Sequence, residues 1–247
     1  MRKTFILTAI ALVLGLSANA QTDTVTLQKR WQHSVQLGVG IGASAPVPIP
    51  NRISEMSYTP YLCYAGGYKL RCALGPKVGV KTGLQLRHQG MSAQAKVYQM
   101  FTQASIDDAD VSGYFTGYNE TDINATYISV PLLFSFAPNE KWTFDAGLFA
   151  AFKVQGHFGG AVKDGYIRID TPTGDRAEVD YESFDFSDEI NPFNFGIQIG
   201  AERNISSRWS AWLDFTWALN STFKSTFRGL EYSMYNIYGL LGVGYHL

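Results

Sequence analysis

Long apolar runs and cysteines are scarce in this sequence. Beyond the first twenty residues no run of about 18 apolar residues occurs, which excludes a membrane-spanning helix in that part of the chain. The cysteines are Cys63 and Cys72. On one extended strand they would lie roughly 30 Å apart, whereas a disulfide needs Cα atoms within about 7 Å. We therefore expect two free thiols.

A concentrated basic face is also missing. Arg2, Lys3, the apolar residues 5–16 and the small residues 18–20 have the pattern of a cleaved signal peptide over residues 1–20. Without its two cations, the chain keeps 18 Lys and Arg residues against 21 Asp and Glu residues. We expect an exported protein with one domain over residues 21–247. A mildly acidic chain does not suit a nucleic-acid partner.

Alternation of apolar and polar residues is the main pattern that the sequence contains. Side chains alternate across a strand, so a period of two predicts strands and argues against long helices. The segment W-T-F-D-A-G-L-F-A-A-F-K, residues 142–153, is one example. Eight segments share the pattern: Trp31–Ala43, Tyr61–Leu74, Lys77–Gly90, Tyr127–Phe136, Trp142–Gln155, Phe193–Arg203, Trp209–Leu219 and Asn236–Leu247.

The connections between these segments alternate in length. Short joints at 75–76, 138–141 and 204–208 alternate with stretches at 44–60, 91–126, 156–192 and 220–235. This alternation is typical of outer-membrane barrels, which have short periplasmic turns and long extracellular loops. The sequence predicts an all-β fold: a single up-and-down antiparallel transmembrane β-barrel of eight strands in a Gram-negative outer membrane. Ten strands are the alternative, since 166–170 and 177–181 could add a hairpin to the ring. We expect these two segments to extend the barrel above the membrane instead.

In each segment, alternate residues form an apolar side and a polar side, which we call the apolar and the inward parity. The apolar parity is predicted to face lipid. Trp31, Trp142, Trp209 and Tyr245 lie on it, next to the periplasmic ends of four strands. Rings at one height form the aromatic girdle of a membrane interface. The other parity is rich in Gly, Ala, Ser and Gln, which suits the narrow interior of an eight-stranded barrel. Outer-membrane lipid is therefore the first expected partner.

Six charged residues fall on the inward parity in the periplasmic half. They are Lys69, Arg71, Lys81, Asp145, Glu202 and Asp214. An unpaired charge in so narrow a space would be costly, so we predict a lumen network of ion pairs and hydrogen bonds. If side chains fill the lumen, the network stabilises the barrel and carries no current. The alternative is that these charges form a path for protons or ions.

The two longest loops are acidic and aromatic. Residues 156–192 hold nine acids against three cations, and 91–126 holds five more acids. Neither contains the D-x-[DN]-x-[DN]-G spacing of a calcium-binding EF-hand. Solvation explains the charge, while calcium binding stays open. The interleaved aromatics indicate ordered loops or a surface that binds an extracellular or secretion-system protein.

Catalytic motifs are absent from the sequence. It contains no G-x-S-x-G, H-E-x-x-H or C-x-x-C. His157 is expected to point inward and His88 outward, so the two do not converge. We predict no catalytic, metal-binding or cofactor-binding residue, and keep a lipid-modifying outer-membrane enzyme as the rival class.

Three segments resemble one known family. Y-I-S-V-P-L-L-F at 127–134 resembles the Y-x-x-I-P-L-L-L signature of the PorT-like outer-membrane β-barrel family of Bacteroidetes-type bacteria. Residues 193–200 and 83–90 resemble two further strands of that family. The resemblance implies a barrel and, through PorT, an accessory role in type IX secretion. Residues 238–247 resemble the terminal signal that the barrel-assembly machinery reads, except that the chain ends in Leu247.

Overall fold

The computed structural model describes residues 30–106, 109–227 and 229–247. The predicted signal peptide lies outside these ranges. The described residues form ten strands and one short helical turn: β1 (Trp31–Pro46), β2 (Ile53–Pro60), β3 (Cys63–Ala73), β4 (Val78–Ile106), β5 (Ala109–Phe136), β6 (Trp142–Ile169), β7 (Arg176–Asp185), η1 (Ser187–Glu189), β8 (Phe193–Asn204), β9 (Trp209–Ala218) and β10 (Met234–His246). Among them, no helix has the length and apolar character needed to cross a membrane.

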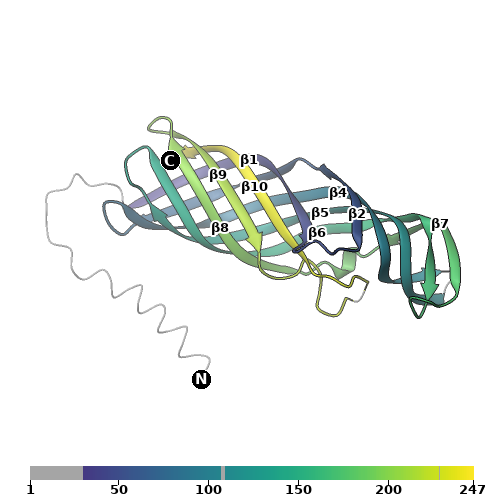
Figure 1. Ribbon diagram of the computed structural model, residues 1–247. Coiled ribbons are helices and arrows are strands. Elements are labelled where there is room, and N and C mark those ends of the chain that lie inside the picture. Colours follow the sequence, from purple (N-terminus) through teal and green to yellow (C-terminus); the bar gives the residue numbers. More distant parts are fainter. Residues whose placement is uncertain (1–29, 107–108, 228) are drawn as a thin grey trace, which may run out of the picture.

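Eight of the strands close into an antiparallel barrel (Figure 1). The order around the ring is β1, β3, β4, β5, β6, β8, β9 and β10, and β10 pairs with β1 over Ser34–Pro46 to close it. The predicted eight-stranded barrel is confirmed. Cys63 and Cys72 are free.

Two of the predicted loops are mostly strand. β4, β5 and β6 each run for 28 or 29 residues and project beyond the barrel at one end (Figure 1). β2 pairs with β4 above β3, and β7 pairs with β6 above β8. These five strands form an extension of the wall, and the hairpin of β6 and β7 belongs to it rather than to the ring. Residues 166–169 and 177–181 thus extend the barrel above the membrane, as expected, and do not add a ninth and tenth strand to the ring.

Polarity reverses along the long strands. On the outward side of β5, Ile128, Val130, Leu132, Phe134 and Phe136 are followed toward the extension by Thr126, Asn124, Asp122 and Glu120. The inward side changes in the opposite sense, from Ser129 to the buried Ile123 and Phe115. A strand that leaves lipid for water must exchange its apolar face in this way. The alternation of apolar and polar residues therefore continues along the whole of β5. Its apolar side faces outward in the barrel and inward in the extension.

A bulge in β6 corrects the expected direction of His157. The ladder between β5 and β6 shifts register between Thr126 and Tyr127, which leaves Val154 as the extra residue of β6. A bulge of one residue exchanges the two faces of a strand beyond it. Consequently Phe158 points inward and is buried, whereas His157 is exposed on the outer face. The prediction that His157 points into the lumen was wrong.

Candidate functional site: a closed lumen below an apolar cavity

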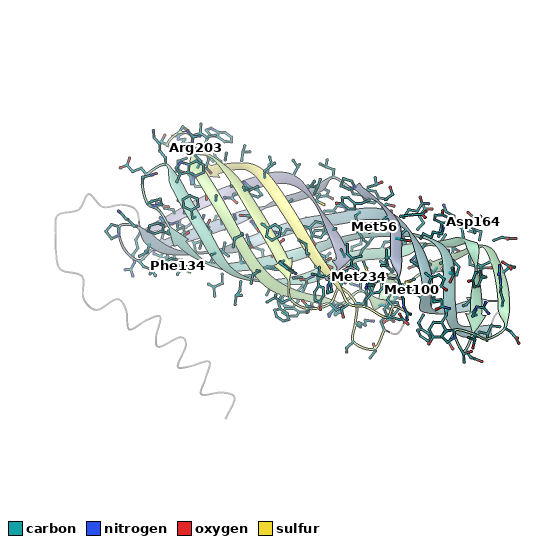
Figure 2. All side chains as sticks on the ribbon, in the orientation of Figure 1. Met56, Met100, Phe134, Asp164, Arg203 and Met234 are labelled. Atoms are coloured by element: carbon teal, nitrogen blue, oxygen red, sulfur yellow. The ribbon has the colours of Figure 1, made fainter. Side chains whose placement is uncertain are left out.

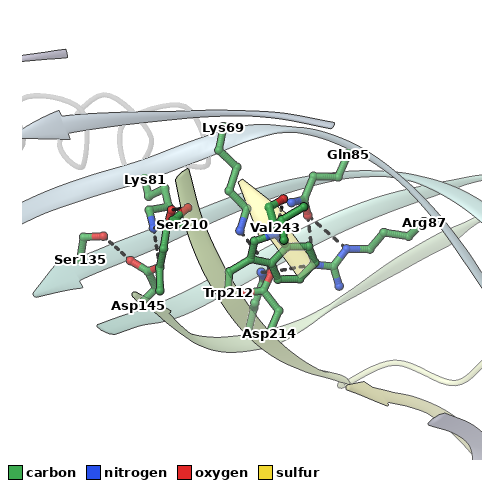
Figure 3. A network of polar contacts seen from close by, with 12 residues as sticks. Lys69, Lys81, Gln85, Arg87, Ser135, Asp145, Ser210, Trp212, Asp214 and Val243 are labelled. Carbon is green, nitrogen blue, oxygen red and sulfur yellow. Dashed lines mark hydrogen bonds and ion pairs between the residues drawn. The ribbon is translucent and has the colours of Figure 1, made fainter. Parts of the chain in front are cut away.

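The lower lumen, at the end with the short turns, is centred on Lys81. Its Nζ atom lies 2.6 Å from Asp145 Oδ2 and 2.8 Å from Glu202 Oε2 (Figure 3). Ser210 Oγ donates to Glu202 Oε1 at 2.7 Å, and Ser135 Oγ donates to Asp145 Oδ1. All five side chains are buried. One cation thus lies between two anions whose remaining oxygens are also occupied.

A second cluster surrounds Asp214. Its Oδ2 atom accepts from Lys69 Nζ at 3.2 Å, from Arg87 Nη2 at 3.3 Å and from Gln198 Nε2 at 3.0 Å. Gln85 Oε1 accepts from Arg87 Nε and Nη2 at 3.1 and 3.0 Å (Figure 3). The Lys69 ammonium also lies 5.1 Å from the centre of the Trp212 ring. Charges in a narrow lumen are tolerated when paired in this way.

The membership of the network differs from the six predicted residues at one position. The structure brings Lys69, Lys81, Asp145, Glu202 and Asp214 together, but Arg71 contacts Gln32, with Nη1 3.2 Å from Oε1. The third cation is Arg87, which is buried on the inward face of β4 and was not among the predicted residues. Three cations then face three anions. Parity alone could have included Arg87, because it shares the inward face of β4 with Lys81.

The centre of the lumen is closed. Tyr127, Asn194, Asn236 and Tyr238 are buried above the charges, and the void beside Tyr127 and Arg87 measures about 10 Å³. That volume is at most the room of one water molecule. Below the charges, a vestibule of about 530 Å³ opens at the end with the short turns.

A larger apolar cavity lies above the closed layer. Its volume is about 540 Å³, and Met91, Met100, Met234, Phe115 and Phe158 line it. Figure 2 shows Met56, Met100 and Met234 near the junction of the barrel with the extension. Residues 223–227 and 229–232 lie at this junction, where Phe223 packs edge-on against Phe158 with ring centres 4.6 Å apart. Burial raises the pKa of Tyr232, which also lines the cavity, to about 12.

The exposed His157 belongs to a small polar cluster outside the cavity. His157 Nδ1 lies 3.0 Å from Ser187 Oγ and 4.0 Å from Asp185 Oδ2. Ser187 donates from its hydroxyl and its backbone N–H to Asp185 Oδ1, which lowers the pKa of that carboxyl. A catalytic serine must instead give its proton to the histidine. Since the Ser187 proton is directed to Asp185, this cluster orders the turn before β8.

Comparisons with known proteins agree with the closed ring. The family described as outer membrane protein beta-barrel domain matches residues 19–224. This chain belongs to that family. No curated protein matches the sequence. From its membership of this family, the strands of the protein span the outer membrane, with the short turns in the periplasm and the extension outside the cell.

Solved structures with a similar fold include other outer-membrane barrels. Ail of Yersinia pestis, solved with the heparin analogue sucrose octasulfate, is 13% identical, and the match covers 88% of this chain and 99% of Ail with a TM-score of 0.39. OprG of Pseudomonas aeruginosa is 11% identical, with coverage of 87% and 95% and a TM-score of 0.30. The protease OmpT of Escherichia coli is 11% identical, with coverage of 92% and 100% and a TM-score of 0.31.

The predicted girdle residues lie on the outward face at the periplasmic end of the barrel. Trp31, Trp142 and Trp209 begin β1, β6 and β9, and each is more than a third exposed. Tyr245 lies opposite Trp209 in the ladder, with ring centres 5.1 Å apart. Arg203 lies 5.5 Å from the centre of the Trp142 ring. A second aromatic group near the outer rim, including Phe152 and Phe193 at 5.2 Å, was not predicted.

Acids of the extension such as Glu120 and Glu178 lie on its outer surface, whereas Glu182 lines the cavity. Lys163 pairs with Glu120 at 2.9 Å, and Arg176 pairs with Glu178 at 2.8 Å while lying 4.0 Å from the centre of the Tyr166 ring. Within the described ranges, no group of three or more acidic, His or Cys side chains is placed to hold a metal ion. The calcium alternative therefore has no structural support in this part of the chain.

Proposed function

We propose that this outer-membrane barrel binds ligands at its extracellular extension and does not conduct solutes. Two features support the proposal: a void of only about 10 Å³ at the centre of the lumen and an ordered five-stranded extension around a cavity of about 540 Å³. Conduction would need a continuous water path, whereas binding needs a preformed concave site. In this proposal, the lumen charges stabilise the barrel, and Trp31, Trp142, Trp209 and Tyr245 anchor it at the periplasmic interface in contact with lipid.

Planar-bilayer recordings test the closed lumen. The purified wild type should give no current steps above those of an empty bilayer. The triple variant Arg87→Ala, Tyr127→Ala and Tyr238→Ala, which removes the two large rings of the closed layer and the cation next to it, should conduct if it keeps the slower unheated mobility of a folded barrel on gels. Steady ohmic steps from the wild type would overturn the proposal.

An accessory role in type IX secretion is the second candidate. The Y-I-S-V-P-L-L-F segment of β5 supports it through its resemblance to the PorT-like family. Because the lumen is closed, such a role would use the extension or the periplasmic turns as a scaffold for a secretion-system protein. Deletion of the gene should then reduce secretion of type IX cargo. Unchanged secretion would reject the secretion role and leave ligand binding as the proposed function.

We also infer that the protein is not a lipid-modifying enzyme. The hydroxyl of Ser187 is bonded to Asp185, and His88 is engaged 3.0 Å from Thr126 Oγ1 on another strand. His157→Ala should leave the composition of lipid A unchanged in mass spectra of whole-cell extracts. A changed composition of lipid A in this variant would instead support a lipid-modifying enzyme.

A further inference from the structure

We infer that the extracellular cavity binds a small, neutral or cationic apolar molecule. This inference rests on the proposed function and names the class of ligand. It follows from three features of the cavity: its volume and lining, an acidic side chain in its wall, and a break in the barrel wall beside it.

The volume and lining suit an apolar molecule of moderate size. A cavity of about 540 Å³ lies within the range of about 300–1,000 Å³ usual for ligand sites. Met56, Met91, Met100 and Met234 contribute four flexible thioether side chains to its wall. Methionine adapts its shape to different apolar ligands, so the site is suited to a class of molecules rather than to one rigid shape.

Two facing residues of β4 and β5 mark one wall of the cavity. Ala95 lies directly opposite Asn119 in the ladder between these strands, and both residues line the cavity. Ala95 is small, so a larger side chain at this position would occupy part of the cavity.

A carboxylate in the cavity wall selects against anions. Glu182 lines the cavity and is exposed. Like charges repel, and this carboxylate disfavours a ligand with a sulfonate, phosphate or carboxylate group. The same carboxylate attracts a cation or leaves a neutral molecule unaffected.

The barrel wall is incomplete where the cavity approaches the membrane rim. β1 pairs with β3 only as far as Gly40 and Cys63, and β2 pairs with β4. Between β1 and β2 in the described structure, the Tyr58 hydroxyl donates to the Gly42 carbonyl. Met56 and Tyr58 are exposed here and line the cavity. Ile41, on the outer face below this point, is exposed to lipid, so an apolar molecule dissolved in the outer leaflet lies next to the entrance.

Binding can be measured with N-phenyl-1-naphthylamine, a neutral fluorescent probe with one N–H donor. Wild-type protein in nanodiscs should show saturable fluorescence above that of empty nanodiscs. Ala95→Trp, which fills the cavity beside Asn119, should abolish this signal. Ala146→Trp adds the same side chain to the exposed outer face of β6 and should keep it. Absence of a wild-type signal, or equal binding by the two tryptophan variants, would overturn the inference.

A matched anionic probe tests the charge. The anionic relative 8-anilinonaphthalene-1-sulfonate should bind the wild type at least about tenfold more weakly than the neutral probe. Equal binding of the anion would overturn the charge selection.

The conductance experiment tests the closed barrel and the binding experiment tests the ligand class, so either claim can be overturned without the other. A wild type that conducts ions would overturn the proposed closed barrel even if the cavity binds the probe. A wild type that neither conducts nor binds the probe would overturn the ligand class and leave the closed barrel standing. Every variant must first show the heat-dependent gel mobility of a folded barrel.

Discussion

Lys81 Nζ lies between the carboxylates of Asp145 and Glu202, at 2.6 and 2.8 Å, in the buried lumen of the barrel. Asp145 belongs to β6 and Glu202 to β8, which are two and three positions away in the ring from β4, the strand of Lys81. The contact therefore joins strands that are not neighbours in the ring. It links them inside the lumen, where no backbone ladder connects them.

Replacement of Lys81 by methionine should destabilise the barrel by about 3 to 5 kcal/mol, because two buried carboxylates lose their cation. The free energy of unfolding can be measured by guanidinium titration in detergent micelles, with tryptophan fluorescence as the signal. Lys77→Met, at an exposed position in the first periplasmic turn, is the matched control and should change stability by no more than about 0.5 kcal/mol. Equal stability of the two variants would show that the lumen contacts contribute little.

Replacement of Arg71 by alanine should cost less than the Lys81 replacement. Arg71 contacts the neutral Gln32 and lines the open vestibule. Loss of this hydrogen bond is expected to cost about 1 kcal/mol, and no carboxylate is left without a partner. The same titration, run beside Arg87→Met, checks the ranking, since Arg87 contacts Asp214. A larger loss for Arg71→Ala than for Arg87→Met would contradict the observed membership of the network.

The bulge at Val154 predicts which neighbouring positions are accessible from outside. In a Cys63→Ala, Cys72→Ala background, His157→Cys should react rapidly with a membrane-impermeant maleimide on intact cells. Phe158→Cys should react at least about tenfold more slowly, because Phe158 points inward and packs against Phe184, Phe186 and Phe223. The reverse order of reactivity would mean that β6 continues without a bulge.

Limited trypsin digestion should distinguish ordered strands from loops in the extension. Lys96 and Lys163 lie within the paired strands β4 and β6, while Arg52 and Lys224 lie between strands and are exposed. Proteases cut exposed irregular segments in preference to hydrogen-bonded strands. When intact cells are treated with trypsin, mass spectrometry should therefore detect fragments cut after Arg52 or Lys224 first. Early cleavage at Lys96 and Lys163 would indicate that the extension opens.

The sequence by itself determined the barrel. Alternation over eight segments, with large apolar residues such as Leu132 and Phe134 on one side, is enough to choose the lipid-facing side, because side-chain direction alternates in every strand. The short turns and the even strand number follow from the same pattern. The inward position of the lumen charges also follows, since parity fixes the side on which each residue lies.

Only the tertiary structure decided which charges meet, where the strands end and what lies above the membrane. Arg87 rather than Arg71 faces Asp214 because the stagger between strands sets the height of each side chain in the lumen, and a single strand does not reveal that stagger. The bulge at Val154 reversed the direction of His157 through one extra residue. The apolar cavity forms because β4, β5 and β6 exchange their apolar faces on leaving lipid, so that Met100 and Phe115 turn away from water.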